Sequence, residues 1–374
     1  MSEYQYYEFQ AVDRPLDEAA RRALRDISTR ARITATSFTN TYQWGDLKAD
    51  PAKLMERWFD LHLHVTNWGT RRLMIRMPKR VLDPQRLDPF LREVEDVSVQ
   101  TAGDNLILDI NPVGIEPEDD DDGTGWLAAL APLRADLMSG DLRLFYLLWL
   151  SAVEAGTFED DEPEPLPGIG PLTGPIEAAA NFFAIDDDLV QAAAERPFAE
   201  APESRTPSEI REAIAALGQQ RMAELLSRLF LGDPHVAVEL RAELRHHLAA
   251  AEVPPPRTVG ELRARAEAIR LARERRKAER EAAEQRRRAE EAEKARRARI
   301  DALARRGESV WREIESEIER RNAGSYDRAA EMLRDLQALA AERGTAEEFA
   351  RRLRDIRERH VRKERFIDRL KGMG

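Results

Sequence analysis

The stretch RLARERRKAEREAAEQRRRAEEAEKARRARI, residues 270–300, restricts what this chain can fold into more than any other segment. It holds 13 basic and 7 acidic side chains and hardly any apolar side chain larger than alanine. A segment of this composition has no broad apolar face to bury in a core. Three interpretations remain: an arm that binds nucleic acid, a coiled-coil strand, or a helical rod stabilised by its own ion pairs.

A coiled coil needs Leu, Ile or Val at the a and d positions of its heptads. Alanine and glutamine bury little area and paired arginines repel each other, so the sequence argues against a strong homodimeric seam. With Ala278 at position d, the seam would consist of Ala278, Ala282, Gln285, Ala289, Ala292, Arg296, Arg299 and Leu303.

Ion pairs within a single helix are better supplied. Glutamate precedes lysine or arginine by four residues in the favourable order at several places, and each such pair contributes about 0.2–0.5 kcal/mol. These pairs are Glu284–Arg288, Glu290–Lys294 and Glu293–Arg297. Alanine adds helix propensity, and Thr258 is suited to cap the N-terminus. We therefore predict one exposed helix over residues 258–305, about 70 Å long.

The surplus of positive charge leaves two roles for this helix. As a spacer it only separates two domains, whereas as an arm it contacts phosphates with weak, salt-sensitive affinity. The candidate nucleic-acid contacts in the arm and in the tail that follows it are Arg286, Arg287, Arg288, Arg296, Arg297, Arg299, Arg351, Arg352, Arg354, Arg362, Lys363 and Arg365. The opposing interpretation is that neighbouring glutamates and the acidic middle of the chain neutralise these cations.

Charge is distributed unevenly along the chain. Residues 257–374 hold 34 basic and 25 acidic side chains, and because the whole chain has a net charge of −11, residues 1–256 carry a net −20. The acidic part repels polyanions, so any contact with nucleic acid is expected in the arm and tail. The absence of cysteine excludes disulfides, thiolate zinc sites and cysteine nucleophiles, and it is typical of a reducing cytosol.

Two further features predict a cytoplasmic protein that does not contact a membrane. The first ten residues, MSEYQYYEFQ, lack the basic and apolar regions of a signal peptide. The most apolar run, LFYLLWL at residues 144–150, is far shorter than the roughly 20 residues that a membrane span needs. We interpret it as a buried helix.

Residues 1–112 predict an α+β domain. The expected strands are residues 4–12, 33–44 and 71–77, with a hairpin over 97–110 that turns at Gly103 and Asp104. Helices are expected from about Leu16 to Ile27, where apolar residues recur at helical spacing, and from Pro51 onward.

Residues 51–65 admit two interpretations. As a strand, the segment would place Asp60, His62 and His64 on one face, where they could bind a metal ion. As a helix, it gathers its apolar residues on one side and points the two histidines about 200° apart. The helix is the preferred interpretation, so the sequence predicts no metal site, and it predicts no cofactor elsewhere.

Aromatic residues are dense in the same domain. Phe38, Tyr42, Trp44 and Trp68, with Arg71 and Arg72, would form a stacking surface for nucleic-acid bases if these side chains pointed outward. The alternative is that they lie in the core, as most aromatic residues on strands do.

Residues 124–255 predict a helical domain bordered by two acidic segments, 116–123 and 159–175. Apolar helices are expected over residues 126–137 and 142–153, and four or five short helices over 176–251. Proline and like charge predict that the two acidic segments are unpacked hinges.

Residues 308–374 predict a small helical unit after the long helix. Apolar residues recur at helical spacing in three successive segments, from Val310 to Ile318, from Tyr326 to Leu339 and from Phe349 to Ile356. Thr345 and Glu348 predict a capping box at the start of the third helix.

Four segments, YYEFQAVDRPL, SFTNTYQWGDLKADP, NWGTRRLMIRMP and YDRAAEMLRDLQALAAERG, together resemble a group of uncharacterised bacterial proteins. The helical tail is also similar to the ends of some bacterial proteins that carry a SWIM-type zinc motif. That motif needs cysteines, which this chain lacks, so the zinc is not carried over. The resemblance implies a bacterial origin and no particular activity.

No motif for nucleotide binding or hydrolysis is present, since the chain contains no GxxxxGK[ST], GxSxG or HExxH. We therefore expect a non-catalytic cytosolic adaptor or scaffold in a larger assembly. The sequence neither identifies its protein partner nor gives its oligomeric state. The alternative is a nucleic-acid-associated protein that uses the basic arm and tail. A third interpretation is an enzyme with a site in the α+β domain, although the sequence shows no recognisable set of acid, base and nucleophile there.

Overall fold

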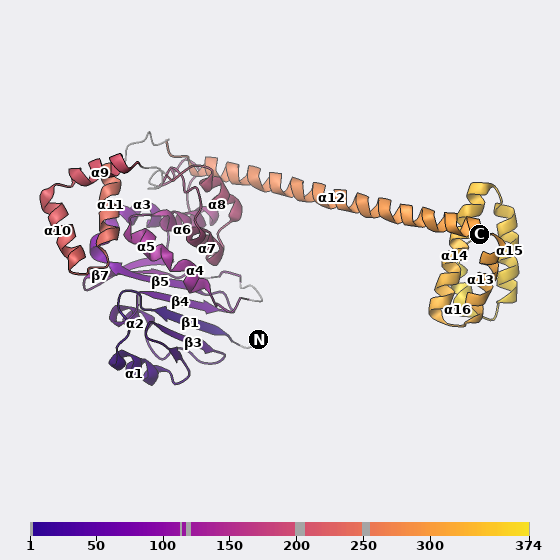
Figure 1. Cartoon of the computed structure of the whole chain (residues 1–374), viewed down its shortest axis with the longest axis horizontal. Coiled ribbons are helices and arrows are strands. Elements are labelled where there is room, and N and C mark those ends of the chain that lie inside the picture. The colour runs from indigo at the N-terminus through magenta and orange to yellow at the C-terminus, as the bar shows by residue number, and fades with distance from the viewer. Residues whose placement is uncertain (1–2, 113, 117–120, 199–205, 249–254, 374) are drawn as a thin grey trace. The chain divides into compact units, whose positions relative to one another are not determined.

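The computed structural model describes residues 3–112, 114–116, 121–198, 206–248 and 255–373. The chain divides into two compact units, Met1–Ala272 and Arg273–Gly374, here called unit 1 and unit 2. The predicted domain boundaries at residues 112 and 124 both lie inside unit 1. An antiparallel sheet is followed by a mostly helical region, a long helix and a short helical tail, which is the predicted fold class (Figure 1).

Unit 1 is built on a seven-stranded sheet in the order β2-β3-β1-β4-β5-β7-β6, with antiparallel pairing between all neighbours. The strands are β1 (Gln5–Gln10), β2 (Arg32–Ile33), β3 (Ser37–Tyr42), β4 (Leu61–Thr66), β5 (Arg71–Pro78), β6 (Val97–Ala102) and β7 (Asn105–Ile110). The β6–β7 hairpin turns at Gly103 and Asp104 as predicted. Gly103 has a φ of +62°, a conformation that favours glycine.

Both faces of the sheet are buried. On one face, Leu61, Leu63 and Val65 of β4 pack into the largest hydrophobic core of unit 1. On the other face, Tyr7, Phe9 and their neighbours form a second core. Since successive side chains of a strand point to opposite faces, one strand supplies both cores.

Helices cover each face of the sheet (Figure 1). On the second core lie α1 (Glu18–Ile27) and α2 (Pro51–Arg57), which bury Leu24, Leu54 and Met55. The first core is completed by α3 (Asp88–Leu91), α4 (Trp126–Leu130), α5 (Pro132–Met138), α6 (Arg143–Glu154), α7 (Gly174–Phe182) and α8 (Asp187–Ala194). The sheet is therefore the middle layer of unit 1.

The apolar run LFYLLWL lies in α6, and every one of its side chains is buried, as predicted. It packs with the sheet and with α7 and α8 in the first core. Within the described ranges, no helix has both the length and the apolarity that crossing a bilayer requires.

The prediction of a helix over residues 51–65 is wrong. The helix α2 ends at Arg57, and Leu61–Thr66 forms β4 between β1 and β5. The alternation of Leu61, Leu63 and Val65 satisfies a strand, because all three side chains are buried on one face. Pairing with two neighbouring strands outweighs the helical spacing that the apolar residues of this segment also display.

The acidic segment 159–175 is irregular up to residue 173, as predicted, and α7 begins at Gly174, but the segment is not an unpacked hinge. Ile169 is fully buried in the first core. Glu164 is also buried, and its carboxylate accepts hydrogen bonds from Arg257 and from the hydroxyl of Tyr146. This ion pair offsets the like charge on which the hinge prediction rested.

The other predicted hinge, 116–123, lies partly outside the described residues. Among those that are described, Asp121 accepts a hydrogen bond from the indole Nε1 of Trp126 (2.9 Å) and pairs with Arg71. The backbone oxygen of Asp122 accepts a hydrogen bond from the hydroxyl of Tyr4 (2.9 Å). The end of this segment is thus attached to the sheet and to α4.

Three helices, α9 (Pro207–Ala216), α10 (Gln219–Phe230) and α11 (Val236–Leu248), follow α8. With α7 and α8 they make five in the described part of residues 174–248, in agreement with the predicted four or five. The helix α11 packs against α9 and α10 and also contacts α5. It therefore links α10 to the rest of unit 1.

The long charged helix is confirmed as α12 (Val259–Arg306). Thr258 caps it: its hydroxyl accepts the N–H of Glu261 (3.2 Å), whose carboxylate accepts the N–H of Thr258 (3.0 Å). The first turns of α12 bury Val259 and Leu262 in the first core. Residues 271–299 are all exposed.

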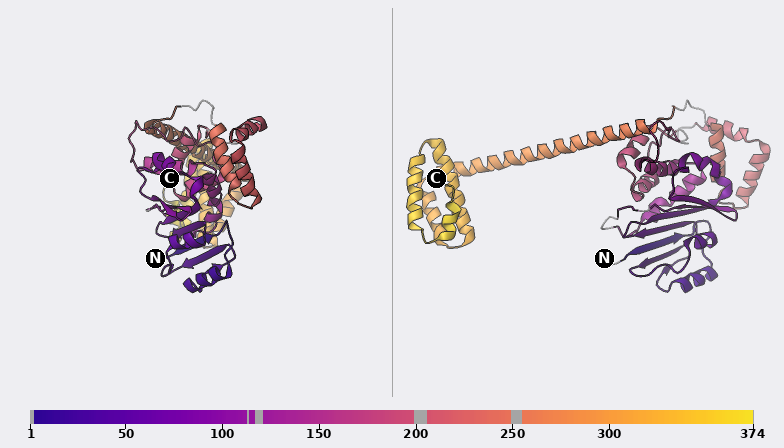
Figure 2. Two further views of the ribbon diagram at one scale, coloured as in Figure 1. Left: turned by 90° about the vertical axis from the view of Figure 1, so that its left-hand side faces the viewer. Right: turned by 180° about the vertical axis from the view of Figure 1, so that it is seen from behind.

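The tail consists of α13 (Glu308–Glu319), α14 (Ala323–Arg343), α15 (Ala346–Arg359) and α16 (Glu364–Ile367), in which α14 packs against both α13 and α15 (Figure 2). The three predicted apolar stripes meet in one core. The predicted capping box is wrong, because the side chain of Thr345 makes no capping hydrogen bond. Its φ of −107° and ψ of 24° depart from the extended conformation that a capping residue adopts.

Candidate functional site

The most unusual surface of unit 1 lies on α10. Four apolar side chains near its C-terminal end are exposed: Leu226 (65%), Leu229 (55%), Phe230 (91%) and Leu231 (81%). Grouped apolar side chains of this kind mark places where another molecule packs. We call these four residues the α10 apolar face.

The helical period explains how this face is separated from the buried side of α10. Leu226, Leu229 and Phe230 recur at spacings of three and four residues and share one side of the helix. Leu225, which lies four residues before Leu229 and about 100° around the helix from Leu226, is buried (4%), so the buried side of α10 begins next to Leu229. The helix is thus covered along one side and bare along the other.

Ion pairs fix α10 onto α11. Arg228 donates to both carboxylate oxygens of Glu239 (2.7 and 2.9 Å), and Arg221 donates to Glu239 (2.7 Å) and to Glu243 (3.0 Å). These hydrogen bonds, that of Arg228 first, lower the pKa of Glu239 to about 2. Because Glu239 remains charged at neutral pH, the pairs hold the apolar face of α10 outward.

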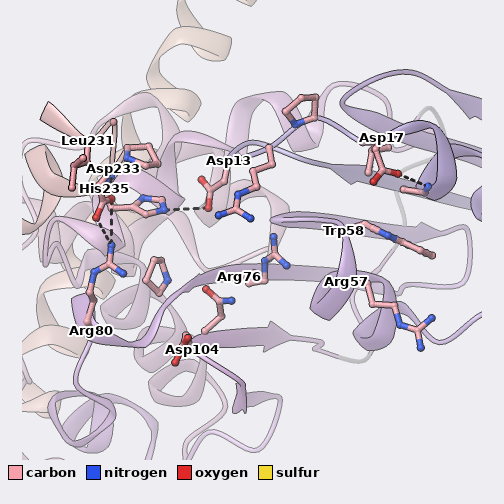
Figure 3. A pocket seen from close by; sticks show the side chains of 18 of the residues that line it. Asp13, Asp17, Arg57, Trp58, Arg76, Arg80, Asp104, Leu231, Asp233 and His235 are labelled. Carbon is pink, nitrogen blue, oxygen red and sulfur yellow. Dashed lines mark hydrogen bonds and ion pairs between the residues drawn. The ribbon is translucent and has the colours of Figure 1, made fainter. Parts of the chain in front are cut away.

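A polar cleft of about 980 Å³ adjoins the α10 apolar face, and Leu231 lies at its edge (Figure 3). Its walls come from the segment before α1, the end of α2, β5 with the β6–β7 turn, and the loop between α10 and α11. The charged side chains that line it are Asp13, Arg14, Asp17, Arg57, Arg76, Arg80, Asp104, Arg228 and Asp233, and the imidazole of His235 lies among them.

Asp13 lies at the centre of an ion-pair network in this cleft. Arg134 donates to both of its oxygens (2.9 and 2.7 Å), and Nε2 of His235 lies 3.3 Å from Oδ2 (Figure 3). Burial raises the pKa of Asp13, but hydrogen bonds from His235 and Arg134 outweigh burial and hold the pKa well below its usual range. Asp13 is therefore a fixed anion at neutral pH.

Arg80 connects the sheet side of the cleft to the α10–α11 loop. Its guanidinium donates to Glu239 (3.2 Å) and to Asp233 (3.2 Å). Asp233 also accepts a hydrogen bond from Arg228 (2.8 Å). These ion pairs therefore hold α10 and α11, and with them the α10 apolar face, against the sheet side of the cleft.

The polar lining of the cleft consists mainly of arginine and aspartate side chains. Among the described residues that line it there is no Ser, Thr, Lys or Tyr. Its one histidine faces a carboxylate that Arg134 already engages.

The histidines of β4 lie on one face of the sheet, as the strand alternative required, but they do not form a metal site. The His62 ring stacks on Phe9 and the His64 ring on Tyr7. Asp60 pairs instead with Arg76 (2.8 Å). In the part of the chain that the structure describes, no group of three or more His, Asp or Glu side chains is placed to hold a metal ion.

The predicted aromatic surface is only partly exposed. Phe38 is fully buried in the second core, and Tyr42 packs edge-on against Tyr7. Trp44 (82%) and Trp68 (50%) are exposed. Assigning Phe38 to a surface is therefore wrong, because pairing of β3 with β1 turns its ring into the core opposite Phe9.

The two arginines assigned to the same surface are engaged inside unit 1. Arg71 is buried, pairs with Asp121 and lies over the ring of Trp126, so its assignment to a surface is also wrong. Arg72 makes two hydrogen bonds to the carboxylate of Asp109 (2.8 and 2.7 Å). The alternation of β5 points these two neighbours to opposite faces of the sheet.

Carboxylates of unit 2 neutralise most candidate cations of the arm. The pairs are Arg287–Glu291 (3.9 Å), Arg288–Glu284 (2.5 Å), Arg296–Glu293 (3.7 Å), Arg297–Glu342 (2.6 Å) and Arg299–Glu331 (2.7 Å). Arg286 donates to the backbone oxygen of Ala282. The arm therefore offers fewer free cations than its composition suggests.

The candidate cations of the tail divide into two groups. Arg352 pairs with Glu308 (2.6 Å), and Lys363 pairs with Glu319 (2.7 Å). Among the described residues, no carboxylate oxygen lies within 4.0 Å of the guanidinium groups of Arg351, Arg354, Arg362 and Arg365.

Three of the tail candidates meet at one place. Arg362, Lys363 and Arg365 line a cleft of about 1080 Å³ together with Arg321. Four glutamates line the same cleft: Glu315, Glu319, Glu358 and Glu364. Arg321 has a φ of +52°, which is uncommon for a residue other than glycine. The structure thus brings these cations together, whereas the arm cations are spread along α12.

The α10 apolar face is absent from the candidates that the sequence suggested. A signal was present in the run LLSRLFL at residues 225–231, which places apolar side chains on more than one side of a short helix. One core contact cannot bury all of them.

Comparison of the chain with protein-family models, with curated proteins and with solved structures finds no match.

Proposed function

We propose that this protein is a non-catalytic cytosolic adaptor or scaffold that binds a protein partner within a larger bacterial assembly. The observation that carries the proposal is the α10 apolar face, in which Phe230 is 91% exposed. Leaving such side chains in water forfeits about 1.5–3 kcal/mol each relative to burial, and a bound partner recovers that free energy.

The polar surroundings of this face also favour a binding role. The cleft beside Leu231 supplies charged groups at the edge of an apolar centre, which is the usual layout of a protein interface. Its ion pairs hold α10 in place, so the partner meets a preorganised surface.

The exposed part of α12 suits a scaffold as well. Residues 271–299 bury no side chain in any of the three cores, and ion pairs such as Glu284–Arg288 stabilise the helix locally. A helix of this kind can lengthen a scaffold although the helix has no hydrophobic core of its own.

Site-specific crosslinking in cells tests the proposal. A photoreactive phenylalanine analogue replaces Phe230 in the full-length chain, and the same analogue replaces Leu271, an exposed residue of α12 (53%), as the control. We expect irradiation to give one dominant covalent adduct with another protein at position 230 and none at 271. Absence of an adduct at position 230 and also at Leu226 would contradict an adaptor that uses α10.

Association with nucleic acid is the second candidate function, and one observation favours it. Arg362 and Arg365 line the tail cleft with Arg321 and have no carboxylate oxygen within 4.0 Å among the described residues. Unit 2 holds 30 basic and 23 acidic side chains. Contacts of this kind would be to phosphates, with little sequence preference.

A further inference from the structure

We infer that the end of the sheet where β1 begins binds a basic segment of a partner protein, whose lysine or arginine side chains stack on Trp44 and Trp68. The inference goes beyond the proposed use of the α10 apolar face, because the two surfaces share no residue. It follows from the register of the strands, from the hydrogen bonds that fix the loops at this end, and from the carboxylates in those loops.

Strand register places the two tryptophans at the same end of the sheet (Figure 1). Gln5, near the start of β1, pairs with Tyr42 of β3 on one side and with Thr66 of β4 on the other. Trp44 and Trp68 each follow two residues after one of those partners. Neighbouring strands lie about 4.8 Å apart, so the backbones that lead to the two rings are about 10 Å apart. An extended segment of about three residues spans that distance.

Hydrogen bonds hold the loop after β3 against β1. The side-chain amide of Gln5 donates to the backbone oxygen of Gly45 (2.9 Å). The hydroxyl of Tyr7 donates to Oδ1 of Asp46 (2.6 Å). Both bonds fix the residues that directly follow Trp44, whose side chain is 82% exposed.

The loop after β4 is held in the same way. The backbone N–H of Tyr4 donates to Oδ1 of Asn67 (2.9 Å), and the N–H of Asn67 donates to the backbone oxygen of Tyr4 (3.1 Å). A Cβ on Gly69, whose φ is +98°, would collide with the backbone oxygen of Ile115, so residues 114–116 cross directly beside Trp68. Fixed backbone on both sides presents the two rings with little ordering left for a partner to impose.

Carboxylates are concentrated in these loops. The segments that meet here, residues 3–4, 43–48, 66–69, 114–116 and 121–124, are called the tryptophan end. They contain five acidic residues and one basic residue, Lys48. Asp121 pairs with Arg71. The other four are exposed and, among the described residues, have no basic side-chain nitrogen within 4.0 Å: Glu3, Asp46, Glu116 and Asp122.

The local groups, and not the charge of the whole unit, set the potential at the tryptophan end. The hydroxyl of Tyr4 donates to the backbone oxygen of Asp122 (2.9 Å). Burial, together with the charges of Asp122 and Asp121, raises the pKa of Tyr4, because a phenolate would face these carboxylates. An anion is therefore disfavoured at this place and a cation is favoured.

An exposed indole with carboxylates in its own loop suits an ammonium or guanidinium group. A cation over the ring face is attracted by the quadrupole of the ring, and tryptophan is the strongest aromatic side chain in this respect. Carboxylates at the same surface add complementary charge. A basic peptide segment carries several such cations a few ångströms apart, so one segment can reach both rings.

The same groups argue against the stacking of nucleic-acid bases that the sequence suggested. A base on Trp44 or Trp68 brings phosphates with it, and phosphates need nearby cations. Arg71 already pairs with Asp121. Arg72 is held by two hydrogen bonds to the carboxylate of Asp109. What remains exposed at the tryptophan end is mostly negative and repels phosphate.

Labelled peptides test the inference on the full-length chain. One short peptide alternates arginine with serine, a second has citrulline in place of each arginine, and a third has glutamate there. Citrulline keeps the planar end of the side chain but carries no charge. Binding is measured by fluorescence anisotropy at about 50 mM and about 150 mM salt. We expect the arginine peptide to bind about tenfold more tightly than either of the others, and less tightly at the higher salt.

Variants of the two rings locate the site. Trp44→Ala and Trp68→Ala change exposed side chains (82% and 50%), so the fold should persist. Each should weaken the arginine peptide about threefold and the two together about tenfold, whereas Trp44→Phe, which keeps a ring face, should weaken it less than Trp44→Ala. The matched control Phe230→Ala removes an exposed ring of α10 and should leave binding unchanged. Equal binding to the double variant and to the unmodified chain would overturn the inference.

A second pair of variants tests the carboxylates. Glu3→Gln with Glu116→Gln should weaken the arginine peptide and reduce its salt dependence, because two of the exposed charges are removed. Glu281→Gln with Glu290→Gln makes the same change at exposed positions of α12 and should alter neither property. Equal losses in the two pairs would mean that the peptide responds to net charge alone, which would also overturn the inference.

Two other occupants are outcomes of the same measurements. If the full-length chain is a dimer that loss of both tryptophans dissociates in light scattering, the occupant is the basic α12 of a second copy and not a partner protein. If a labelled oligouridylate binds and the double variant loses it, the surface is a nucleic-acid site. Crosslinking at position 230 reports on the α10 apolar face, so the proposed function and this inference can fail separately.

Discussion

Glu164 and Arg257 form a buried ion pair, 2.9 Å between Oε2 and Nη2, that ties the acidic segment 159–175 to the start of α12. The carboxylate of Glu164 also accepts the backbone N–H of Arg257 (2.9 Å) and the hydroxyl of Tyr146 (2.6 Å). Arg257 donates to the backbone oxygen of Ala192 as well (2.7 Å). Residues far apart in the sequence are joined here by one satisfied polar network.

We predict that Arg257→Ala destabilises the protein strongly. The substitution leaves the buried Glu164 carboxylate with only the more distant Arg196 (3.8 Å) as a cationic partner among the described residues, and removing the main partner of a buried pair costs about 3–5 kcal/mol in comparable cases. The control is Arg265→Ala, which breaks an exposed pair with Glu195 in the first turns of α12 and should destabilise the protein far less. Urea denaturation followed by tryptophan fluorescence compares the two. Similar midpoints for both variants would show that burial does not set the strength of the Glu164 pair.

The second prediction concerns the attachment of α10 and α11 at acid pH. The pKa of Glu239 is lowered to about 2 in the folded state, below its ordinary value of 4.5. The ionised Glu239 carboxylate therefore contributes fully to stability above about pH 4.5, and this contribution is lost as the pH falls toward 2. We expect the urea midpoint to fall between pH 5 and pH 3, and to fall less in Glu239→Gln, which starts from a lower midpoint. Parallel curves for both proteins would contradict this assignment.

The parts of the fold that the sequence predicted are those with strong local signals. The β6–β7 hairpin has a glycine and an aspartate at its turn, and α12 combines a threonine cap with a long run of helix-forming residues. Each of these signals lies within the element that it specifies. Both predictions were correct because local preference and the final packing agree.

The errors arose where packing decides between two local options. The residues of β4 show both strand alternation and part of a helical spacing, and pairing with β1 and β5 selects the strand. The cleft could not be predicted at all, because Asp13, Arg80 and His235 come from distant segments. The exposure of Phe230 likewise depends on which helices cover α10, a tertiary property that helical periodicity does not contain.

The third prediction concerns His64. Burial, assisted by Arg72 and opposed by Asp46, lowers the pKa of His64 to about 4. An unfolded histidine titrates near 6.5. Between about pH 6.5 and pH 4 the unfolded state therefore binds a proton that the folded state does not bind, and the stability of the fold decreases as the pH drops through this range. The loss is at most about 1.4 kcal/mol per pH unit. His64→Phe keeps an aromatic ring on Tyr7 and should reduce this pH dependence. An NMR titration of the His64 ring with a midpoint near 6.5 would contradict the prediction.

The fourth prediction concerns α12 by itself. A peptide of residues 258–305 should be substantially helical and monomeric at micromolar concentration, because ion pairs and alanine favour the helix while its seam buries little. Circular dichroism and sedimentation measure the two properties. A control peptide with Ala282→Gly and Ala289→Gly should lose helicity, since each glycine costs about 1 kcal/mol. A tight dimer in sedimentation would show that the alanine seam is sufficient for a coiled coil.

The last prediction tests the nucleic-acid alternative. If the tail cleft binds phosphates, the full-length chain should shift the mobility of RNA or DNA at about 50 mM salt, and the affinity should fall steeply as salt is raised. Arg362→Glu with Arg365→Glu should abolish the shift, because both arginines line the cleft and have no carboxylate oxygen within 4.0 Å among the described residues. Arg21→Glu with Arg22→Glu makes the same change of charge at exposed positions of α1 and should leave the shift in place. Equal losses in both variants would indicate a response to net charge alone. No shift at tens of micromolar protein would remove nucleic acid from the candidate partners.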